Sequence, residues 1–466
     1  MEFNRSKFDD SELLEIYKKL LLPRLIEEKM LIYLRQGKIS KWFSGWGQEG
    51  ISVGSTYAMD KEEYILPMHR NLGVFTTRNI PLYRLFSQFQ GKADGFTKGR
   101  DRSFHFGSQE HRIIGMISHL GPQLGIADGI GLAEKLKESK RSTLVFTGDG
   151  GASEGDFHEA LNVAAVWDLP VIFVVENNCW GLSTPSDEQY RFKHFVDKGI
   201  GYGMKAEQVN GNNILDVISA IRKAKAAQKE NPAPILLELM SFRMRGHEEA
   251  SGTKYYPEGL QEQWKEKDPV TSYTNFLKNE KILSDDLEKE ISDQIKKEIT
   301  ESFDKANKES AIVPSIKDEL EDVYSNNRNG ITSPATKSTS EKRFIDAISD
   351  GLKESMAKYS DMVIMGQDIA EYGGAFKVTE GFVDLFGKDR VRNTPLCESA
   401  IVGASLGLSI SGIKSVMEMQ FSDFVTCGFN QIVNNLAKIH WRWGQKADVV
   451  VRMPTGGGTA AGPFHS

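Results

Sequence analysis

The clearest pattern of apolar and polar positions lies in residues 143–181. An apolar run ends at Asp149 and its neighbouring glycines, a helical pattern continues to Trp167, and a β-branched run follows that ends just before Asn178. Short continuous apolar runs of this kind are typical of strands that are buried on both faces of a parallel sheet. The pattern therefore predicts a strand–helix–strand unit of an α/β fold.

Similar patterns predict further elements on either side of this unit. Residues 11–36 carry leucines at helical spacing and stop before a glycine, as expected of a core-facing helix. Apolar residues recur every four positions from Leu287 to Phe303, behind Ser284 as the expected N-cap. In the second half we expect a helix over residues 343–359 and strands over residues 362–365, 415–421 and 447–453.

The two halves are separated by a segment without periodicity. Residues 311–341 are rich in Ser, Asn, Thr and Pro, which indicates a linker. We therefore expect one domain over residues 1–310 and a second over residues 342–466, in keeping with ~100–200 residues per domain. About 30 extended residues could span ~100 Å, so the second domain could dock on another subunit.

Composition and charge exclude several classes of function. The chain is 39% hydrophobic and 26% charged, with a net charge of −6 and a pI near 6.0, so nucleic acid and anionic membrane are not expected partners. No apolar leader and no window of ~18 apolar residues is present, which favours a cytoplasmic protein. The three cysteines are odd in number and are expected to be reduced packing residues.

The polar ends of the two strands in residues 143–181 carry candidate chemistry. Asn178 follows Asp149 by 29 residues, and a right-handed crossover would place both at one sheet edge, where a carboxylate and an amide oxygen could bind Mg²⁺. Gly150 and Gly151 would expose backbone N–H groups to an anion, so a metal-bridged diphosphate is the expected guest. A dinucleotide fingerprint would need a third glycine where Ser153 stands, and no P-loop motif occurs. The remaining alternative is a tight turn without a ligand.

This GDG…NN arrangement resembles the signature of thiamine-diphosphate enzymes. Such enzymes need a carboxylate beside the aminopyrimidine ring of the cofactor, where it shares a proton with a ring nitrogen. Glu398, with apolar neighbours in NTPLCESAIVG (393–403), is the candidate, although taken alone it could be an ordinary glutamate at the start of a helix.

Nearly all of the chain resembles the decarboxylating dehydrogenase component of the 2-oxo acid dehydrogenase complexes. Residues 1–310 resemble its α-subunit and residues 342–466 the first part of its β-subunit, fused in that order. The resemblance implies a thiamine-diphosphate-binding α/β fold of parallel sheets flanked by helices. It rests on GWGQEG (45–50), MHRNLGVFTTRNIPL (68–82), KGRDRSFHFG (98–107), GDG…NNCWG, FRMRGHEEASGTKYYP (242–257), AEYGGAFKVTEG (370–381), NTPLCESAIVG and MEMQFSDFVTCGFNQIVN (417–434).

The resemblance also implies roles for individual residues. Glu398 would activate the cofactor, His247 would be an active-site histidine with Arg243 beside it, and His465 matches a histidine of the β-subunit. The further cofactor-binding residues it implies are Arg70 and His69, where relatives often carry Tyr, at the diphosphate; Gly150 and Gly151 as N–H donors; Ser118 and Leu120 below the aminopyrimidine; Phe424 stacked on that ring; and Asp149, Asn178 and the carbonyl of Trp180 at the metal.

The chain departs from the family pattern at two places. Glu248 replaces the serine whose phosphorylation inactivates relatives, and the sequence stops at Ser466, before the rest of the pyrimidine domain and the C-terminal domain of the β-subunit. We therefore expect an incomplete β part and poor stability of the chain, because its final strand would leave an exposed edge. A zinc site at His105, His111 and His119 is not expected, because their spacing matches no known ligand pattern.

The function that follows is the decarboxylation of a 2-oxo acid with thiamine diphosphate and Mg²⁺, and transfer of the acyl group to the lipoyl domain of the acyltransferase component. The motifs HRNLGVFTTRNIPL, NTPLCE and MQFSDF favour a branched-chain substrate, with a pyruvate or acetoin dehydrogenase component as the alternative. Two further hypotheses compete with it: a transketolase-like enzyme, and a truncated fragment that only binds cofactor or assembles with partners. At least a homodimer, α2β2-like, is expected.

Overall fold

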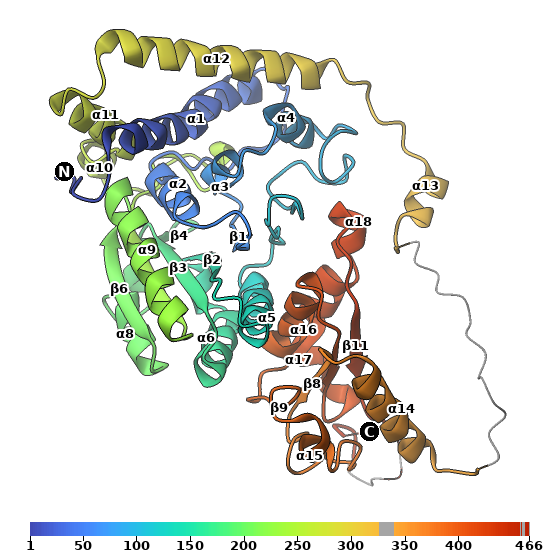
Figure 1. The fold of residues 1–466 in the computed structure, drawn as a ribbon. Coiled ribbons are helices and arrows are strands. Elements are labelled where there is room, and N and C mark those ends of the chain that lie inside the picture. Colours follow the sequence, from blue (N-terminus) through green and yellow to red (C-terminus); the bar gives the residue numbers. More distant parts are fainter. Residues whose placement is uncertain (326–339, 457, 459–461, 466) are drawn as a thin grey trace. The chain divides into compact units, whose positions relative to one another are not determined.

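The computed structural model describes residues 1–325, 340–456, 458 and 462–465. They form two compact units, each of which is described here by itself (Figure 1). The first unit contains residues 1–124 and 140–313, and the second contains residues 125–139 and the described residues from 314 onward. The domain boundaries expected from the sequence stay a prediction. Among the described helices, none is long and apolar enough to cross a membrane.

The described strands of the first unit form a five-stranded parallel sheet in the order β1-β2-β3-β7-β6. Gly148 is paired with Glu176, so Asp149 and Asn178 follow at the same edge of the sheet, as predicted. The apolar runs of residues 143–181 are confirmed as neighbouring strands. The bounds are β1 Ile65–Leu66, β2 Thr143–Gly148, β3 Val171–Asn177, β6 Lys205–Asn210 and β7 Ile235–Met240, with a small hairpin of β4 Trp180–Gly181 and β5 Thr184–Pro185.

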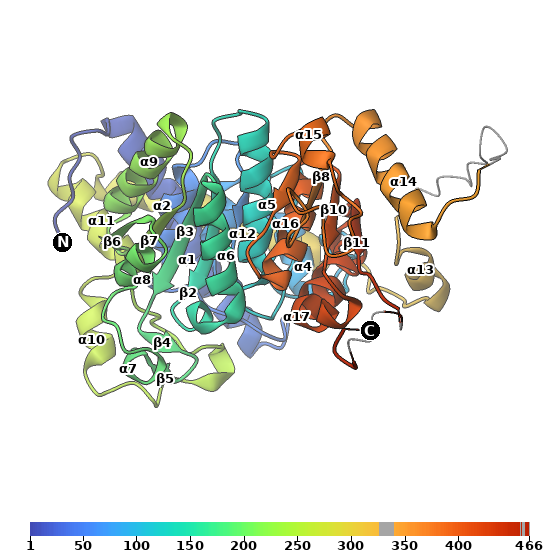
Figure 2. The ribbon, with the colours of Figure 1, turned by 90° about the horizontal axis from the view of Figure 1, so that it is seen from below.

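Helices cover both faces of this sheet (Figure 2). Alternate strand residues such as Leu144 and Phe146 belong to the core cluster that contains apolar residues of α1 and α9, while Val145 on the opposite face is also fully buried. This two-sided burial explains why the strand sequences are continuously apolar rather than alternating. The helices are α1 Asp10–Arg35, α2 Glu49–Tyr57, α3 Leu72–Thr77, α4 Leu82–Gln90, α6 Gly155–Trp167, α7 Ser186–Gln189, α8 Phe195–Gly201, α9 Ile214–Glu230, α10 Leu260–Lys265, α11 Pro269–Asn279 and α12 Asp285–Asn307.

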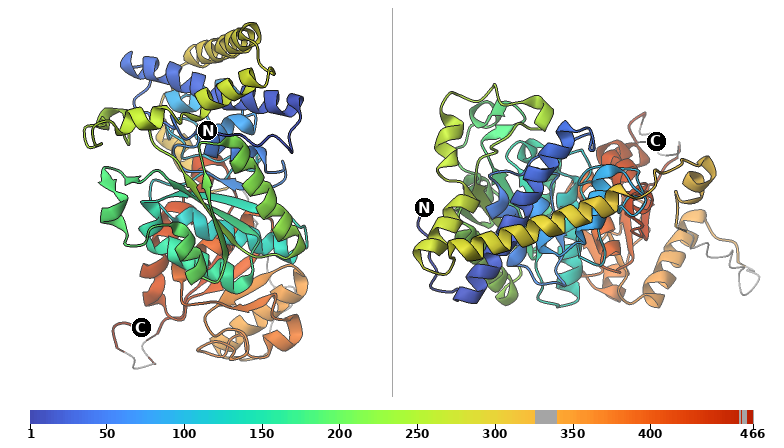
Figure 3. Two further views of the ribbon diagram at one scale, coloured as in Figure 1. Left: turned by 90° about the vertical axis from the view of Figure 1, so that its left-hand side faces the viewer. Right: turned by 90° about the horizontal axis from the view of Figure 1, so that it is seen from above.

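The two long helices agree with the sequence patterns. Helix α1 begins one residue earlier than expected because Asp9 caps it, accepting a hydrogen bond from the backbone N–H of Glu12. Helix α12 begins after Ser284, whose hydroxyl accepts from the N–H of Leu287, as predicted. Figure 3 shows α12 lying along α1 and α4, where its apolar stripe is buried.

The described strands of the second unit form a four-stranded parallel sheet in the order β11-β10-β8-β9. Its core cluster includes Ile364, Val391 and Val416, one from each of three strands, together with Met356 and Phe382. The bounds are α14 Phe344–Lys358, β8 Val363–Gly366, α15 Phe382–Phe386, β9 Val391–Asn393, α16 Glu398–Ile410, β10 Ser415–Glu418, α17 Val425–Asn430, α18 Ile439–Trp443 and β11 Val449–Arg452.

Two helices of the second unit approach each other through glycines. Most of α5 (Pro122–Leu136) belongs to this unit, and its Gly125 and Gly129 lie against α16. A Cβ atom added at Gly129 would clash with the backbone carbonyl of Ala404, and one added at Gly407 would clash with that of Ile126. The absence of side chains therefore permits backbone-to-backbone contact of the two helices.

Two local expectations need correction. The segment 311–341 contains a short helix, α13 (Ile316–Glu321), because the hydroxyl of Ser315 caps the N–H of Asp318. Residues 326–339 of the expected linker lie outside the described part of the chain. All three cysteines are free, but Cys427 is exposed rather than packed.

Candidate active site

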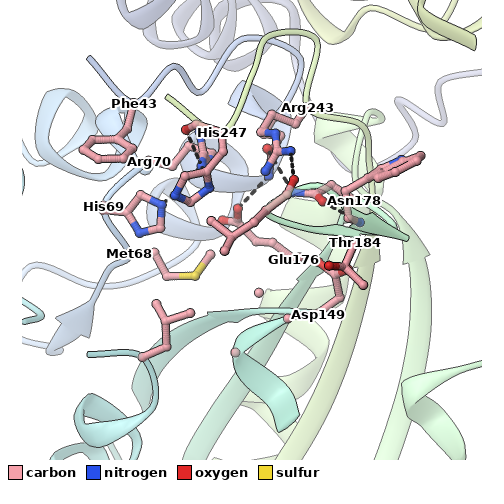
Figure 4. Close-up of a pocket in the computed structure, with 18 of the residues that line it drawn as sticks. Phe43, Met68, His69, Arg70, Asp149, Glu176, Asn178, Thr184, Arg243 and His247 are labelled. Atoms are coloured by element: carbon pink, nitrogen blue, oxygen red, sulfur yellow. Dashed lines mark hydrogen bonds between the residues drawn. The ribbon is translucent and has the colours of Figure 1, made fainter. Parts of the chain in front are cut away.

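The first unit contains a cavity of about 550 Å³ beside the carboxyl ends of β2 and β3 (Figure 4). Its walls come from segments far apart in the sequence, including the loops before α2 and α3 and the segment after β7. The structure brings together here the predicted residues His69, Arg70, Ser118, Leu120, Asp149, Gly150, Gly151, Asn178, Trp180, Arg243 and His247. Their individual roles stay predictions.

Asp149 and Asn178 supply oxygen atoms at the strand end of the cavity. The Asp149 side chain is 1% exposed, and its Oδ2 atom has no hydrogen-bond partner among the described residues. Burial raises the pKa of Asp149 to about 6, against hydrogen bonds from backbone N–H groups. The Oδ1 atom of Asn178 accepts from the N–H of Trp180 at 3.0 Å. A buried, unpartnered carboxylate oxygen beside an amide oxygen is a favourable site for a hard cation.

At the two glycines after β2, an added side chain would lie too close to neighbouring atoms. Gly150 has φ −64°, so no left-handed turn is needed, but a Cβ atom there would lie 3.0 Å from the Cα of Gly181. A Cβ at Gly151 would lie 2.8 Å from the hydroxyl of Thr147. The short 3-10 helix η1 (Gly151–Ser153) begins at the second of these glycines and precedes α6.

Two buried guanidinium groups, those of Arg70 and Arg243, line the same cavity. Arg70 donates to the carbonyl of Ser44 at 2.8 Å, and Arg243 donates to the hydroxyls of Tyr255 and Tyr256 at 2.9 and 3.2 Å. These hydrogen-bond partners are all neutral. Burial and the nearby charge of Arg243 lower the pKa of Arg70 to about 10. Two buried cations held by neutral acceptors favour an anionic guest with several oxygens.

Two histidines lie beside Arg70. The guanidinium approaches His69 Nε2 at 3.2 Å and His247 Nδ1 at 3.3 Å, and the ring of Phe43 packs edge-on against both imidazoles. Burial, then the charges of Arg70 and Arg243, lower the pKa of His247 to about 4. Burial and Arg70 also hold the pKa of His69 well below its ordinary range. Both rings are therefore neutral near pH 7.

A network around Glu176 was not found from the sequence. The carboxylate of this fully buried residue accepts from Asn71 Nδ2 at 2.5 Å and from Gln48 Nε2 at 2.9 Å, and Gln48 Oε1 accepts from Asn178 at 3.5 Å. Burial raises the pKa of Glu176 to about 7. The network ties the loop before α2, the loop before α3 and the end of β3 together. Gln48 lies within the recognised motif GWGQEG, which was the available signal.

The other predicted residues belong to the second unit. Glu398 is the first residue of α16, and its Oε1 atom accepts from Gln367 Nε2 at 3.0 Å. The rings of Phe424 and His465 lie 5.7 Å apart, and both pack edge-on against Phe421. The structure thus groups Phe424 with His465 and places Glu398 at a helix start.

Comparisons with known proteins match both parts of the chain. Residues 17–315 match the family "Dehydrogenase E1 component", and residues 340–466 match "Transketolase, pyrimidine binding domain". Together the two matches imply thiamine diphosphate as the cofactor.

Several similar curated proteins are named as 2-oxoisovalerate dehydrogenase subunit alpha. The chain is 36% identical over 283 residues to the 2-oxoisovalerate dehydrogenase subunit alpha of Bacillus subtilis, covering 60% of this chain and 86% of that protein. The chain is 34% identical to the mitochondrial protein of that name from Dictyostelium discoideum, over 68% of this chain and 72% of that protein. It is 30% identical to the mitochondrial protein from Homo sapiens, over 67% of this chain and 70% of that protein. The family model matches more than half of the chain, which has a parallel α/β fold with this cavity. The chain therefore belongs to the dehydrogenase E1 component family.

Proposed function

We propose that this chain is the decarboxylating component of a branched-chain 2-oxo acid dehydrogenase, dependent on thiamine diphosphate and Mg²⁺. It would release CO₂ from the 2-oxo acid and pass the acyl group to the lipoyl group of the acyltransferase component. The matches to two domains of thiamine-diphosphate enzymes and the name 2-oxoisovalerate dehydrogenase on the relatives support this proposal.

The observation that carries the proposal is the distribution of charged and polar groups around one cavity. Asp149 Oδ2, the Asn178 amide oxygen and the Trp180 carbonyl are hard oxygen donors of the kind that Mg²⁺ prefers. Arg70 and Arg243 line the same cavity and would hold the diphosphate, with Gly150 and Gly151 as N–H donors. The donor set therefore fits a diphosphate bridged by a divalent cation.

The remaining residues would position the cofactor and the substrate or exchange a proton with the cofactor. The cofactor, when bound, supplies the nucleophile and the electron sink for decarboxylation. Ser118 and Leu120 would support its pyrimidine ring, and Phe424 would stack on that ring. Glu398 would hold a proton on its carboxylate and exchange it with the ring nitrogen. His247 is neutral and can donate or accept one hydrogen bond near the diphosphate, and His465 would contact the substrate.

Assembly is part of the proposal. The cavity lies in the first unit and Glu398 in the second, and in this family the two come from different copies of the domains. We therefore expect at least a homodimer, a lipoyl domain as docking partner and a small 2-oxo acid as substrate. Light scattering measures the first of these, and an active monomer would contradict the shared site.

The decisive experiment combines substrate turnover with one conservative variant. The protein with Mg²⁺ and thiamine diphosphate should decarboxylate 3-methyl-2-oxobutanoate faster than pyruvate, and it should acylate a lipoyl domain. Glu398→Gln keeps the side chain's size but removes its exchangeable proton, so it should bind the cofactor while thiazolium proton exchange slows by orders of magnitude.

Each competing hypothesis gives a different result. A higher kcat/KM for pyruvate than for 3-methyl-2-oxobutanoate would indicate a pyruvate dehydrogenase component. Ketol transfer without lipoyl acylation would indicate a transketolase-like enzyme. Cofactor binding without decarboxylation would favour the hypothesis of a truncated fragment that only binds the cofactor. Wild-type exchange rates in Glu398→Gln would remove that residue from the mechanism.

A further inference from the structure

Glu27 is a buried carboxylate that none of the roles above uses. It belongs to α1, is 1% exposed and does not line the cavity. Its Oε1 atom accepts from the backbone N–H of Gly45 at 2.7 Å, and its Oε2 atom accepts from Trp42 Nε1 at 2.5 Å. Both partners can only donate, so the direction of the two hydrogen bonds is fixed. Glu27 therefore ties the segment 42–46 to helix α1.

The same segment fixes the position of Arg70. The carbonyl of Ser44 accepts a hydrogen bond from Arg70 Nη1 at 2.8 Å. A Cβ atom added at Gly45 would lie 2.6 Å from the carbonyl oxygen of Arg70, so only glycine permits this close approach. Glu27, Gly45, Ser44 and Arg70 therefore follow one another from the helix to the cavity, which Arg70 lines.

The segment 42–46 also contacts the part of the wall that carries His247. The carbonyl of Trp42 accepts from the backbone N–H of Glu249 at 3.1 Å. The ring of Phe43 packs edge-on against the imidazole of His247, with 5.6 Å between the ring centroids (Figure 4). A shift of the segment would therefore change the surroundings of this imidazole as well as those of the guanidinium.

The charge state of Glu27 suits this role. Burial raises the pKa of Glu27 to about 7, against the hydrogen bonds from its two donors, and the charge of Glu49 raises it further. Two cations, Arg70 and Arg245, lie close enough to feel the charge of its carboxylate. At pH 8 the side chain is mostly ionised, and both of its oxygens then accept from the segment 42–46.

We propose that Glu27 is a positioning residue for anion binding, which holds the segment 42–46 so that the Ser44 carbonyl orients the guanidinium of Arg70 toward a diphosphate in the cavity. The inference rests on the proposed function, because it takes a diphosphate as the guest. It adds a residue outside the cavity, which acts through Gly45 and Ser44 and does not contact the guest.

A conservative variant tests this coupling. Glu27→Gln keeps the size of the side chain, but an amide has one oxygen, so its NH₂ group would face one of the two N–H donors. Calorimetry at pH 8 would measure the affinity for Mg²⁺ with inorganic pyrophosphate. We expect a loss of about tenfold, as for one hydrogen bond. In an Arg70→Met background the same change should cause no further loss, because the group that it positions is already absent.

The ring of His247 gives a readout that needs no ligand. Burial, then the charges of Arg70 and Arg243, lower the pKa of His247 to about 4 in the intact site. If Glu27→Gln releases the guanidinium of Arg70, the pKa of His247 should rise toward its ordinary value. NMR titration of the labelled imidazole from pH 8 to about pH 5.5 would detect this rise. A variant that is only less stable, with the site intact, would not show it.

Glu63→Gln is the matched control. Glu63 is 2% exposed, and its carboxylate also accepts from two N–H donors, those of Asp60 at 2.7 Å and Ser142 at 2.9 Å. Neither Glu63 nor these partners line the cavity. This control should lose stability as a buried carboxylate does, but it should bind pyrophosphate and titrate at His247 as the wild type does.

The outcomes distinguish the inference from the proposed function. Unchanged pyrophosphate affinity in Glu27→Gln, or an equal loss in Glu63→Gln, would overturn the inference. A further loss in the Arg70→Met background, or an unchanged titration of His247, would do the same, and each of these results leaves the proposed function intact. Failure of the wild type to bind Mg²⁺ with thiamine diphosphate would overturn the proposed function, while the titration of His247 still decides whether Glu27 positions Arg70.

Discussion

The guanidinium of Arg70 donates a hydrogen bond of 3.0 Å to the backbone carbonyl of His247, across 177 residues of sequence. The same Nη2 atom lies 3.3 Å from His247 Nδ1. One side chain therefore both fixes the backbone of His247 and opposes a positive charge on its ring. This coupling makes the ionisation of His247 a sensitive measure of whether the site is assembled.

His247→Gln should reduce the acid sensitivity of the fold. The folded pKa of His247 is lowered to about 4, below the unfolded value of about 6.5, so the unfolded state binds the proton more tightly. The wild type therefore loses stability as pH falls from about 6.5 to about 4, where His247 takes up a proton in the unfolded state before it does so in the folded state. Urea unfolding at several pH values should show a shallower loss for the variant. The control is exposed His119→Gln, and equal slopes in all three proteins would contradict the assignment.

Cation binding should be linked to the release of a proton from Asp149. Its pKa is raised to about 6 by burial, so the carboxyl is half protonated near pH 6 and a cation must displace that proton. The apparent affinity for Mg²⁺ with pyrophosphate should fall up to about tenfold per pH unit below pH 6 and change less above pH 7. Titrations in buffers of different ionisation enthalpy would count the protons, and no release near pH 6 attributable to Asp149 would contradict the prediction.

Asp149→Asn should separate binding from stability. The neutral amide removes the charge from the one carboxylate among the proposed metal ligands, so Mg²⁺-dependent binding of thiamine diphosphate should be lost. The free energy of unfolding without metal should stay the same or rise at pH 8, because the wild type keeps a buried charge there at a cost. Calorimetry and urea unfolding give the two measurements. Undiminished cofactor affinity would remove Asp149 from the site.

Gly129→Ala should strongly destabilise the second unit. The added Cβ atom would clash with the carbonyl of Ala404, and two backbones cannot separate without opening the contact between α5 and α16, so we expect a loss of about 2 kcal/mol or more. Gly351→Ala in α14 is the matched control, since no heavy atom lies within 4 Å of its added Cβ. It should gain about 0.5–1 kcal/mol. Equal effects in thermal unfolding would contradict the packing argument.

Local sequence patterns predicted β2, β3, β8, β10 and β11, and with them one end of the cavity. Asp149 and Asn178 could be paired because parallel neighbours end at the same sheet edge, a rule that needs only strand order. The network around Glu176 could not be found this way, because its partners come from segments up to 128 residues distant. The helix α13 was missed because a six-residue helix depends on its cap more than on apolar spacing.

The carboxylate of Glu176 limits how related sequences can vary. It receives one N–H from Asn71 and one from Gln48, so each of the three residues is chemically defined by the other two. A basic residue at position 176 would face two amide donors, and the amide oxygens of Asn71 and Gln48 already accept from the N–H of Met68 and from Asn178. Positions 48, 71 and 176 should therefore change together among homologues, as a single inherited unit rather than as three independent sites.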